Sequence, residues 1–193
     1  MEKILILDFG GQYNQLIARR VREQRVYCEL HPHTMPIEEI RRFAPIGIIF
    51  TGGSHSVYLT DSPKPDPGVF DLGVPILGIC YGCQLLAHSL SGLVTAAEDA
   101  SAREYGKTET FFDLTCALFR GLPEESVTWM SHGDYLARVP EGFRLAAHSR
   151  SGRRECDSGQ RPVQARKAHH GFCCCLRRRY FRRRVRHPHG HGR

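Results

Sequence analysis

The first half of the chain alternates between continuous apolar runs and segments with helical periodicity. Apolar runs of four to six residues that end in turn residues are typical of strands buried on both faces of a parallel sheet. Segments whose apolar residues recur every three or four positions are typical of helices that cover such a sheet. We therefore predict a doubly wound, mainly parallel α/β fold. The predicted strands are residues 3–8, 26–30, 46–50 and 74–79, and the predicted helices are residues 12–24, 36–43 and a segment that begins after Gly82.

The pattern changes after Gly92 to shorter and more polar runs. Such runs are typical of strands with one exposed face, so we predict a small antiparallel extension of the fold. Beyond Ser149 we assign no element. The predicted elements of the extension are strands near residues 93–97, 107–112, 127–130 and 143–147, and a helix at residues 114–120.

Charge divides the chain near residue 150. The net charge of the 193 residues is +7. Residues 1–149 contain 13 Lys and Arg against 18 Asp and Glu, a net −5, whereas residues 150–193 contain 14 against 2, a net +12. So abrupt a change in charge, at the start of a segment without apolar periodicity, marks a boundary between the folding part of the chain and the rest. We predict a C-terminally incomplete domain at residues 1–149 and a basic tail at 150–193 that is disordered or non-native.

The composition favours a cytoplasmic protein. No apolar stretch is long enough to span a bilayer, and the N-terminus begins directly with an apolar strand pattern. We therefore expect no membrane association. The eight cysteines are not spaced like a disulfide framework, so we expect reduced thiols in the domain, at Cys28, Cys80, Cys83 and Cys116.

The most informative stretch runs from an apolar strand through Gly78-Ile-Cys80-Tyr81-Gly82 into a helix. This is the pattern of a nucleophile elbow with a cysteine as nucleophile. So tight a turn needs glycine on both sides because neighbouring Cβ atoms would clash. The turn places Cys80 at a helix N-terminus, where we expect the helix dipole to favour the thiolate.

A cysteine nucleophile that attacks a carbonyl also needs an oxyanion hole and a base. Gly52-Gly53 follows a neighbouring strand and can present a backbone N–H without a side chain in the way. The N–H of Tyr81, directly after the nucleophile, is the second candidate donor. The base, a histidine oriented by a carboxylate, must come from elsewhere in the chain.

Each candidate has a structural alternative. A free cysteine is often a small core residue, but flanking glycines at a turn favour the nucleophile for Cys80. The spacing of Cys80 and Cys83 also fits a Cys-x-x-Cys redox or zinc half-site, yet no second ligand pair is found outside the tail, and we expect no metal. Gly52-Gly53 could be a simple turn. His132 is more typical of a structural histidine than of a base.

Six segments together resemble the class I (triad) glutamine amidotransferases, and within them the amidotransferase domains of GMP synthetases. The first and last of these segments separate this branch from other amidotransferases. The segments are Ile4–Tyr13, Val26–Leu30, Thr51–Gly53, Gly78–Gly82 with Gln84, Arg103–Gly106 and Trp129–Asp134.

The resemblance implies a flavodoxin-like fold and a glutaminase reaction. Cys80 would attack the side-chain carboxamide of glutamine, with Gly53 and Tyr81 holding the oxyanion. Ammonia would leave, and water would hydrolyse the glutamyl thioester to glutamate. Gln84 and the backbone of Ser131 and His132 would hold the substrate.

The resemblance also implies a partner, an ATP-pyrophosphatase domain or subunit. In the family that partner uses Mg-ATP to adenylylate xanthosine monophosphate and aminates it with the ammonia, which gives GMP. Its phosphate-binding loop is not in this sequence, so we expect no cofactor in the amidotransferase domain itself. A homo-oligomer is left open.

The sequence departs from the family at the base. The family takes its histidine and glutamate from a Gly-Val-Gln-Phe-His-Pro-Glu motif, which is not found here. His170 lies near the expected distance from Ser131, as a weak candidate base with nothing to orient it. We hypothesise that a frameshift or altered splice replaces the family sequence in the tail. Nucleotide sequence across codons 149–152 tests this, because an alternative frame should encode Phe-His-Pro-Glu.

Two further functions stay open beside the glutaminase. One is a binding domain that takes up glutamine or a synthetase partner without turnover. The other is nucleic-acid binding through phosphate contacts of the arginine-rich tail, for which a disordered polycationic segment is the favoured alternative.

Overall fold

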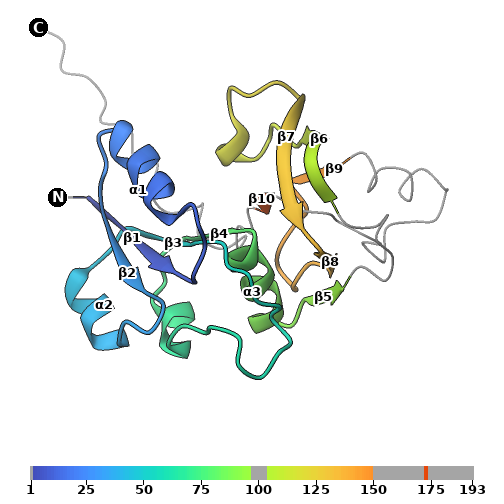
Figure 1. Ribbon diagram of the computed structural model, residues 1–193. Helices are drawn as coiled ribbons and strands as arrows, with labels where there is room; N and C mark the ends of the chain where they lie inside the picture. The colour runs from blue at the N-terminus through green and yellow to red at the C-terminus, as the bar shows by residue number, and fades with distance from the viewer. Residues whose placement is uncertain (1, 97–103, 150–171, 174–193) are drawn as a thin grey trace, which may run out of the picture.

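The computed structural model describes residues 2–96, 104–149 and 172–173. Its centre is a five-stranded sheet with the strand order β10-β4-β3-β1-β2 (Figure 1). The first four strands of the chain are parallel to one another, and β10 is antiparallel to β4. This order confirms the doubly wound fold. The strands are β1 (Lys3–Asp8), β2 (Tyr27–Pro32), β3 (Gly47–Phe50), β4 (Ile76–Ile79) and β10 (Phe172–Cys173).

Helices cover both faces of this sheet because alternate residues of β1 point to opposite sides. Leu5 and Leu7 belong to the larger core cluster, which includes residues of α2, η1 and α3. Ile6 packs instead with Ala18 of α1. Figure 1 shows α1 on one face and α2 with α3 on the other. The helices are α1 (Asn14–Glu23), α2 (Ile37–Phe43), α3 (Tyr81–Ser89) and the short η1 (Pro67–Asp71).

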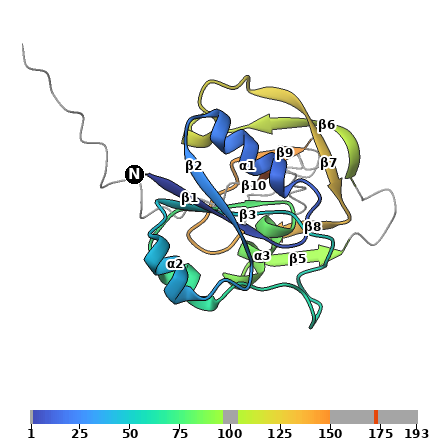
Figure 2. The same cartoon turned by 60° about the vertical axis from the view of Figure 1, so that its left-hand side comes forward.

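The predicted antiparallel extension is present as two small sheets, with the orders β5-β8 and β7-β6-β9. The β5-β8 pair lies beside α3, and β6, β7 and β9 form a separate layer (Figure 2). A three-residue turn, η3, packs Phe119 against Phe112. The elements are β5 (Leu93–Ala96), β6 (Glu104–Phe112), η3 (Ala117–Phe119), β7 (Glu125–His132), β8 (Asp134–Arg138) and β9 (Ala147–Ser149).

Two predicted elements of the extension were wrong in extent. The helix at residues 114–120 is reduced to η3, because the Asp113 side chain accepts hydrogen bonds from both the backbone N–H and the hydroxyl of Thr115. Such local side-chain bonds compete with a helix. The strand at residues 143–147 begins only at Ala147, since Phe143 N–H bonds to the Pro140 carbonyl in a turn. β8 and β10 were not predicted.

None of the helices in the described part of the chain is both long and apolar enough to cross a membrane. The predicted tail, apart from Phe172 and Cys173, lies outside the described residues, as does the candidate base His170.

Candidate active site

Cys80 occupies the turn between β4 and α3 with a left-handed backbone, at φ 51° and ψ −114°. A positive φ is uncommon for a residue with a Cβ and marks local strain of the kind found at functional sites. A Cβ on Gly78 would lie 2.5 Å from the Cys83 nitrogen, and one on Gly82 would lie 2.5 Å from the Phe50 carbonyl oxygen. Both flanking glycines are therefore required by close approach, as the sequence predicted.

The loop after β3 packs directly against this elbow. The position of a Cβ on Gly52 is 3.5 Å from Cys80 Cβ, and that of a Cβ on Gly53 is 3.4 Å from Tyr81 Cγ. The Gly82 N–H donates to the Thr51 carbonyl at 3.1 Å. The two predicted oxyanion donors, Gly53 and Tyr81, thus come from adjacent segments beside Cys80, the predicted nucleophile. Their role in binding an oxyanion stays a prediction.

The turn between β7 and β8 forms the other side of the site. The Cys80 Sγ donates a weak hydrogen bond to the Ser131 carbonyl at 3.9 Å. Gln84 Nε2 donates to the Asp134 carbonyl at 3.0 Å, which ties α3 to this turn. His132 is buried. The structure thus brings the predicted substrate-binding residues Gln84, Ser131 and His132 together around Cys80, and their contacts with glutamine remain predictions.

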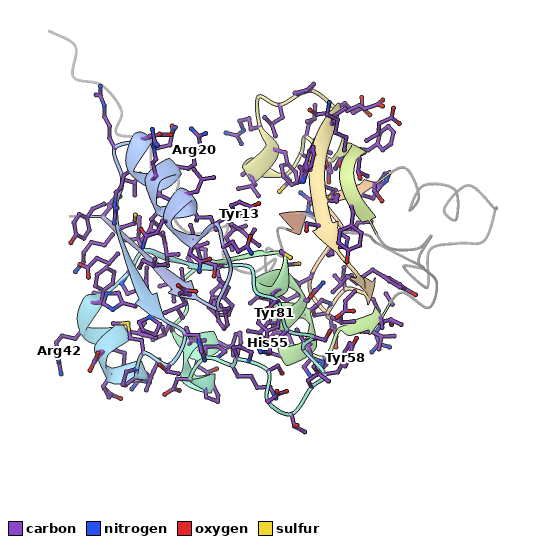
Figure 3. The ribbon with its side chains drawn as sticks, viewed as in Figure 1. Tyr13, Arg20, Arg42, His55, Tyr58 and Tyr81 are labelled. Carbon is purple, nitrogen blue, oxygen red and sulfur yellow. The ribbon has the colours of Figure 1, made fainter. Side chains whose placement is uncertain are left out.

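A third segment, residues 54–66, connects the loop after β3 to both sides of the site. The Tyr58 hydroxyl donates to Asp134 Oδ1 at 3.1 Å, and the Tyr81 hydroxyl donates to the Pro63 carbonyl at 2.6 Å. Figure 3 shows Tyr58 and Tyr81 in the same region beside α3. His55, in the same segment, is exposed. The phenol of Tyr81 therefore anchors the loop whose backbone flanks the nucleophile.

Burial raises the pKa of the Cys80 thiol above its ordinary value, and the Asp134 carboxylate raises it further. The Tyr81 N–H hydrogen bond to the sulfur acts in the opposite direction. The net direction is opposite to the one we expected from the helix dipole alone. Burial and the Asp134 charge thus favour the thiol over the thiolate, so the predicted attack by Cys80 would need a base.

The structure does not place the candidate base. His170 lies outside the described residues. The His31 and Glu29 side chains are 2.9 Å apart, but they lie on β2, and strands β1 and β3 separate β2 from β4. Among the described residues, no group of three or more His, Cys, Asp or Glu side chains could hold a metal ion. Cys83, the partner in the alternative Cys-x-x-Cys interpretation, is buried and is not in a disulfide.

Three residues of the site had no predicted role: Thr51, Tyr58 and Asp134. Thr51 and Asp134 stand inside segments that carried the family resemblance, and that was the available signal. Tyr58 had none, because its contact with Asp134 joins residues 76 positions apart.

Comparison with known proteins identifies the family of this chain. The family profile described as glutamine amidotransferase class-I matches residues 5–163. A glutamine-hydrolyzing GMP synthase of Clostridium botulinum strain Hall is 57% identical over 146 residues, which cover 76% of this chain and 28% of that protein. A protein of the same name from Bacillus pumilus is 57% identical over 148 residues, with 77% of this chain and 28% of the relative covered.

A solved structure gives the same result. The crystal structure of a putative GMP synthase subunit from Thermoplasma acidophilum superposes with a TM-score of 0.67 at 31% identity, and the match covers 78% of this chain and 74% of that one. The chain spans only 28% of the length of the curated relatives named above. These matches confirm the predicted fold and the predicted resemblance. The chain belongs to the class-I glutamine amidotransferase family.

Proposed function

We propose that this chain is the glutamine-hydrolysing part of a GMP synthetase. Its reaction would release ammonia and glutamate from glutamine. The observation that carries the proposal is the strained elbow of Cys80, enclosed by Gly52-Gly53 on one side and by Ser131 on the other. A strained, half-buried thiol beside candidate backbone donors suits attack on a carboxamide carbon.

The ammonia would pass to an ATP-pyrophosphatase domain or subunit that aminates xanthosine monophosphate. The names of the relatives support this choice of acceptor, and the 28% coverage of those relatives leaves room for such a domain. Mg-ATP would be bound by that partner. We propose the cytoplasm as the location, because four cysteines among the described residues are not in disulfides, which suits a reducing compartment.

The test is a glutaminase assay on the full chain, alone and with an added ATP-pyrophosphatase domain of the GMP synthetase type. We expect glutamate release that requires Cys80, so that Cys80→Ala lowers the rate by about 10³-fold or more. Cys83→Ala is the matched control, because it removes a buried thiol of the same helix without touching the nucleophile. Release that survives Cys80→Ala would contradict the proposal.

One observation favours a second candidate, a domain that binds glutamine or the partner without turnover. The pKa of Cys80 is raised. Among the described residues beside it, the Asp134 charge raises this pKa and the hydrogen bond from the Tyr81 N–H lowers it. Without a base, a thiol with a raised pKa is a poor nucleophile at neutral pH. Saturable glutamine binding by calorimetry, with no glutamate released in the presence of the partner domain, would favour this candidate.

A further inference from the structure

We propose that Thr51 is a positioning residue that holds the oxyanion-binding peptide in its working orientation. The inference rests on the proposed function and concerns the same site. It goes beyond that function because it assigns the orientation of the predicted donors to one buried hydroxyl.

The Thr51 hydroxyl lies between two backbone groups, and it accepts a hydrogen bond from one and donates a hydrogen bond to the other. Its oxygen accepts a hydrogen bond from the Phe9 N–H at 3.1 Å. Its own proton is donated to the Gly52 carbonyl at 3.2 Å. Because Phe9 N–H can only donate, the single hydroxyl proton is directed to Gly52. Thr51 is completely buried, so bulk water does not reach its bond with Phe9, while its bond with the Gly52 carbonyl is part-buried.

The hydroxyl determines more than the direction of one carbonyl. The described backbone has no cis peptide bond, so the peptide between Gly52 and Gly53 is trans and planar. In a trans peptide the C=O and the following N–H point in opposite directions. Fixing the Gly52 carbonyl therefore fixes the Gly53 N–H, which is the predicted oxyanion donor.

Two consecutive glycines need such a constraint. Glycine explores a wider range of backbone angles than any other residue, so the peptide between two of them turns over easily. A Cβ on Gly53 would lie 2.6 Å from the Phe9 carbonyl oxygen, so a side chain cannot supply the rigidity there. The hydroxyl of the preceding residue supplies it instead.

The backbone of Thr51 extends the same role to the second donor. Thr51 N–H donates to the Leu7 carbonyl at 3.1 Å, and the Thr51 carbonyl accepts from Gly82 N–H at 3.1 Å. Gly82 directly follows Tyr81, whose N–H is the other predicted donor. Thr51 thus joins the end of β1, the glycine loop and the first turn of α3 through four hydrogen bonds.

The test compares Thr51→Val, which has nearly the same shape without a hydroxyl, with Thr51→Ser, which keeps the hydroxyl. The first probe is a chloroketone analogue of glutamine, and the second is iodoacetamide. In both reactions the Cys80 thiolate forms a C–S bond, a halide ion leaves and the thiol proton goes to solvent. On the proposed function, the chloroketone oxygen would take the place of the carboxamide oxygen of glutamine, whereas iodoacetamide would report on access to the thiolate.

For Thr51→Val we expect labelling by the chloroketone to slow by about 10-fold or more, because displaced donors lose much of their effect. Labelling by iodoacetamide should stay within about two-fold of the unmodified protein, and Thr51→Ser should behave like that protein with both reagents. Thr110→Val is the control for loss of a buried hydroxyl, because Thr110 bonds to the Thr128 hydroxyl at 2.6 Å in the β6–β7 sheet. Equal effects of Thr51→Val and Thr51→Ser, or no effect of either, would overturn the inference.

A second measurement does not depend on any reaction of Cys80. In NMR spectra of protein labelled with ¹⁵N-glycine, we expect the Gly53 amide signal to broaden or to split in Thr51→Val and to stay unchanged in Thr51→Ser. An unchanged Gly53 signal in Thr51→Val would refute the positioning role even if glutamine is hydrolysed. Conversely, a protein without glutaminase activity that shows the expected Gly53 change would contradict the proposed function alone.

Discussion

At the scale of single residues, the negative charge of Asp134 acts on the thiol of Cys80. Burial is the largest cause that raises the pKa of the Cys80 thiol, and the negative charge of Asp134 adds to it. Asn at position 134 would remove the charge and keep an oxygen able to accept from the Tyr58 hydroxyl. The backbone carbonyl that accepts from Gln84 is unaffected by the substitution.

We therefore expect Asp134→Asn to lower the pKa of Cys80. A lower pKa gives more thiolate at neutral pH, so alkylation by iodoacetamide should be faster there, while the rates converge at a pH above both pKa values. The measurement is the alkylation rate as a function of pH, with Glu141→Gln as a control for loss of an exposed carboxylate. A midpoint of the pH profile that moves to higher pH, or that does not move, would contradict the effect assigned to the Asp134 charge.

The sequence was sufficient to predict the elbow around Cys80, which the structure shows, but not the direction in which the pKa of its thiol is shifted. The elbow around Cys80 is local, so its glycines and apolar strand are visible within a few residues. The causes of the raised pKa are burial and Asp134, which lies 54 positions further along the chain. Only the packing of the β7–β8 turn onto α3 brings these groups together.

At the scale of elements, the turn from β4 to α3 is the feature most sensitive to substitution. A Cβ on Gly78 would meet backbone atoms of Cys83 at 2.5 and 2.6 Å, and backbone cannot move aside cheaply. We expect Gly78→Ala to reduce the free energy of unfolding by about 1–3 kcal/mol, the usual cost of overpacking. Ser89→Ala, at the exposed end of the same helix, should change it by less than about 0.5 kcal/mol.

Urea unfolding, followed by circular dichroism, measures the free energy of unfolding of both variants. If Gly78→Ala is as stable as the control, the turn can widen to accept a Cβ at position 78, which would contradict the expected clash with the Cys83 backbone.

The elements were predictable where local pattern and burial agree. β1 to β4 are buried parallel strands and therefore appear as continuous apolar runs. β8 was missed because Asp134–Arg138 is short and obtains its partner, β5, from about 40 residues earlier. The helix predicted at residues 114–120 failed for the opposite reason, since a local contact of Asp113 with Thr115 replaces the helical bonds.

At the scale of the whole molecule, the central sheet depends on residues beyond the charge boundary. β10 pairs with β4 through Phe172 opposite Ile79 and Cys173 opposite Gly78. This pairing covers the edge of the strand that leads directly into Cys80. An uncovered edge strand offers unpaired backbone groups to other chains.

Two truncations separate the contribution of β10 from that of the remaining tail. We expect a chain ending at residue 149 to be less stable than one ending at residue 173, by about 1–3 kcal/mol for the lost ladder bonds. It should also self-associate through β4, as measured by analytical ultracentrifugation alongside thermal unfolding. The two truncations remove different numbers of arginines, so both should be compared at low and at high salt, where a purely electrostatic difference would fade. If the two truncated chains unfold alike and remain equally monomeric at both salt concentrations, β10 does not protect the sheet. The uncovered edge of β4 beside Cys80 would then cause neither loss of stability nor self-association.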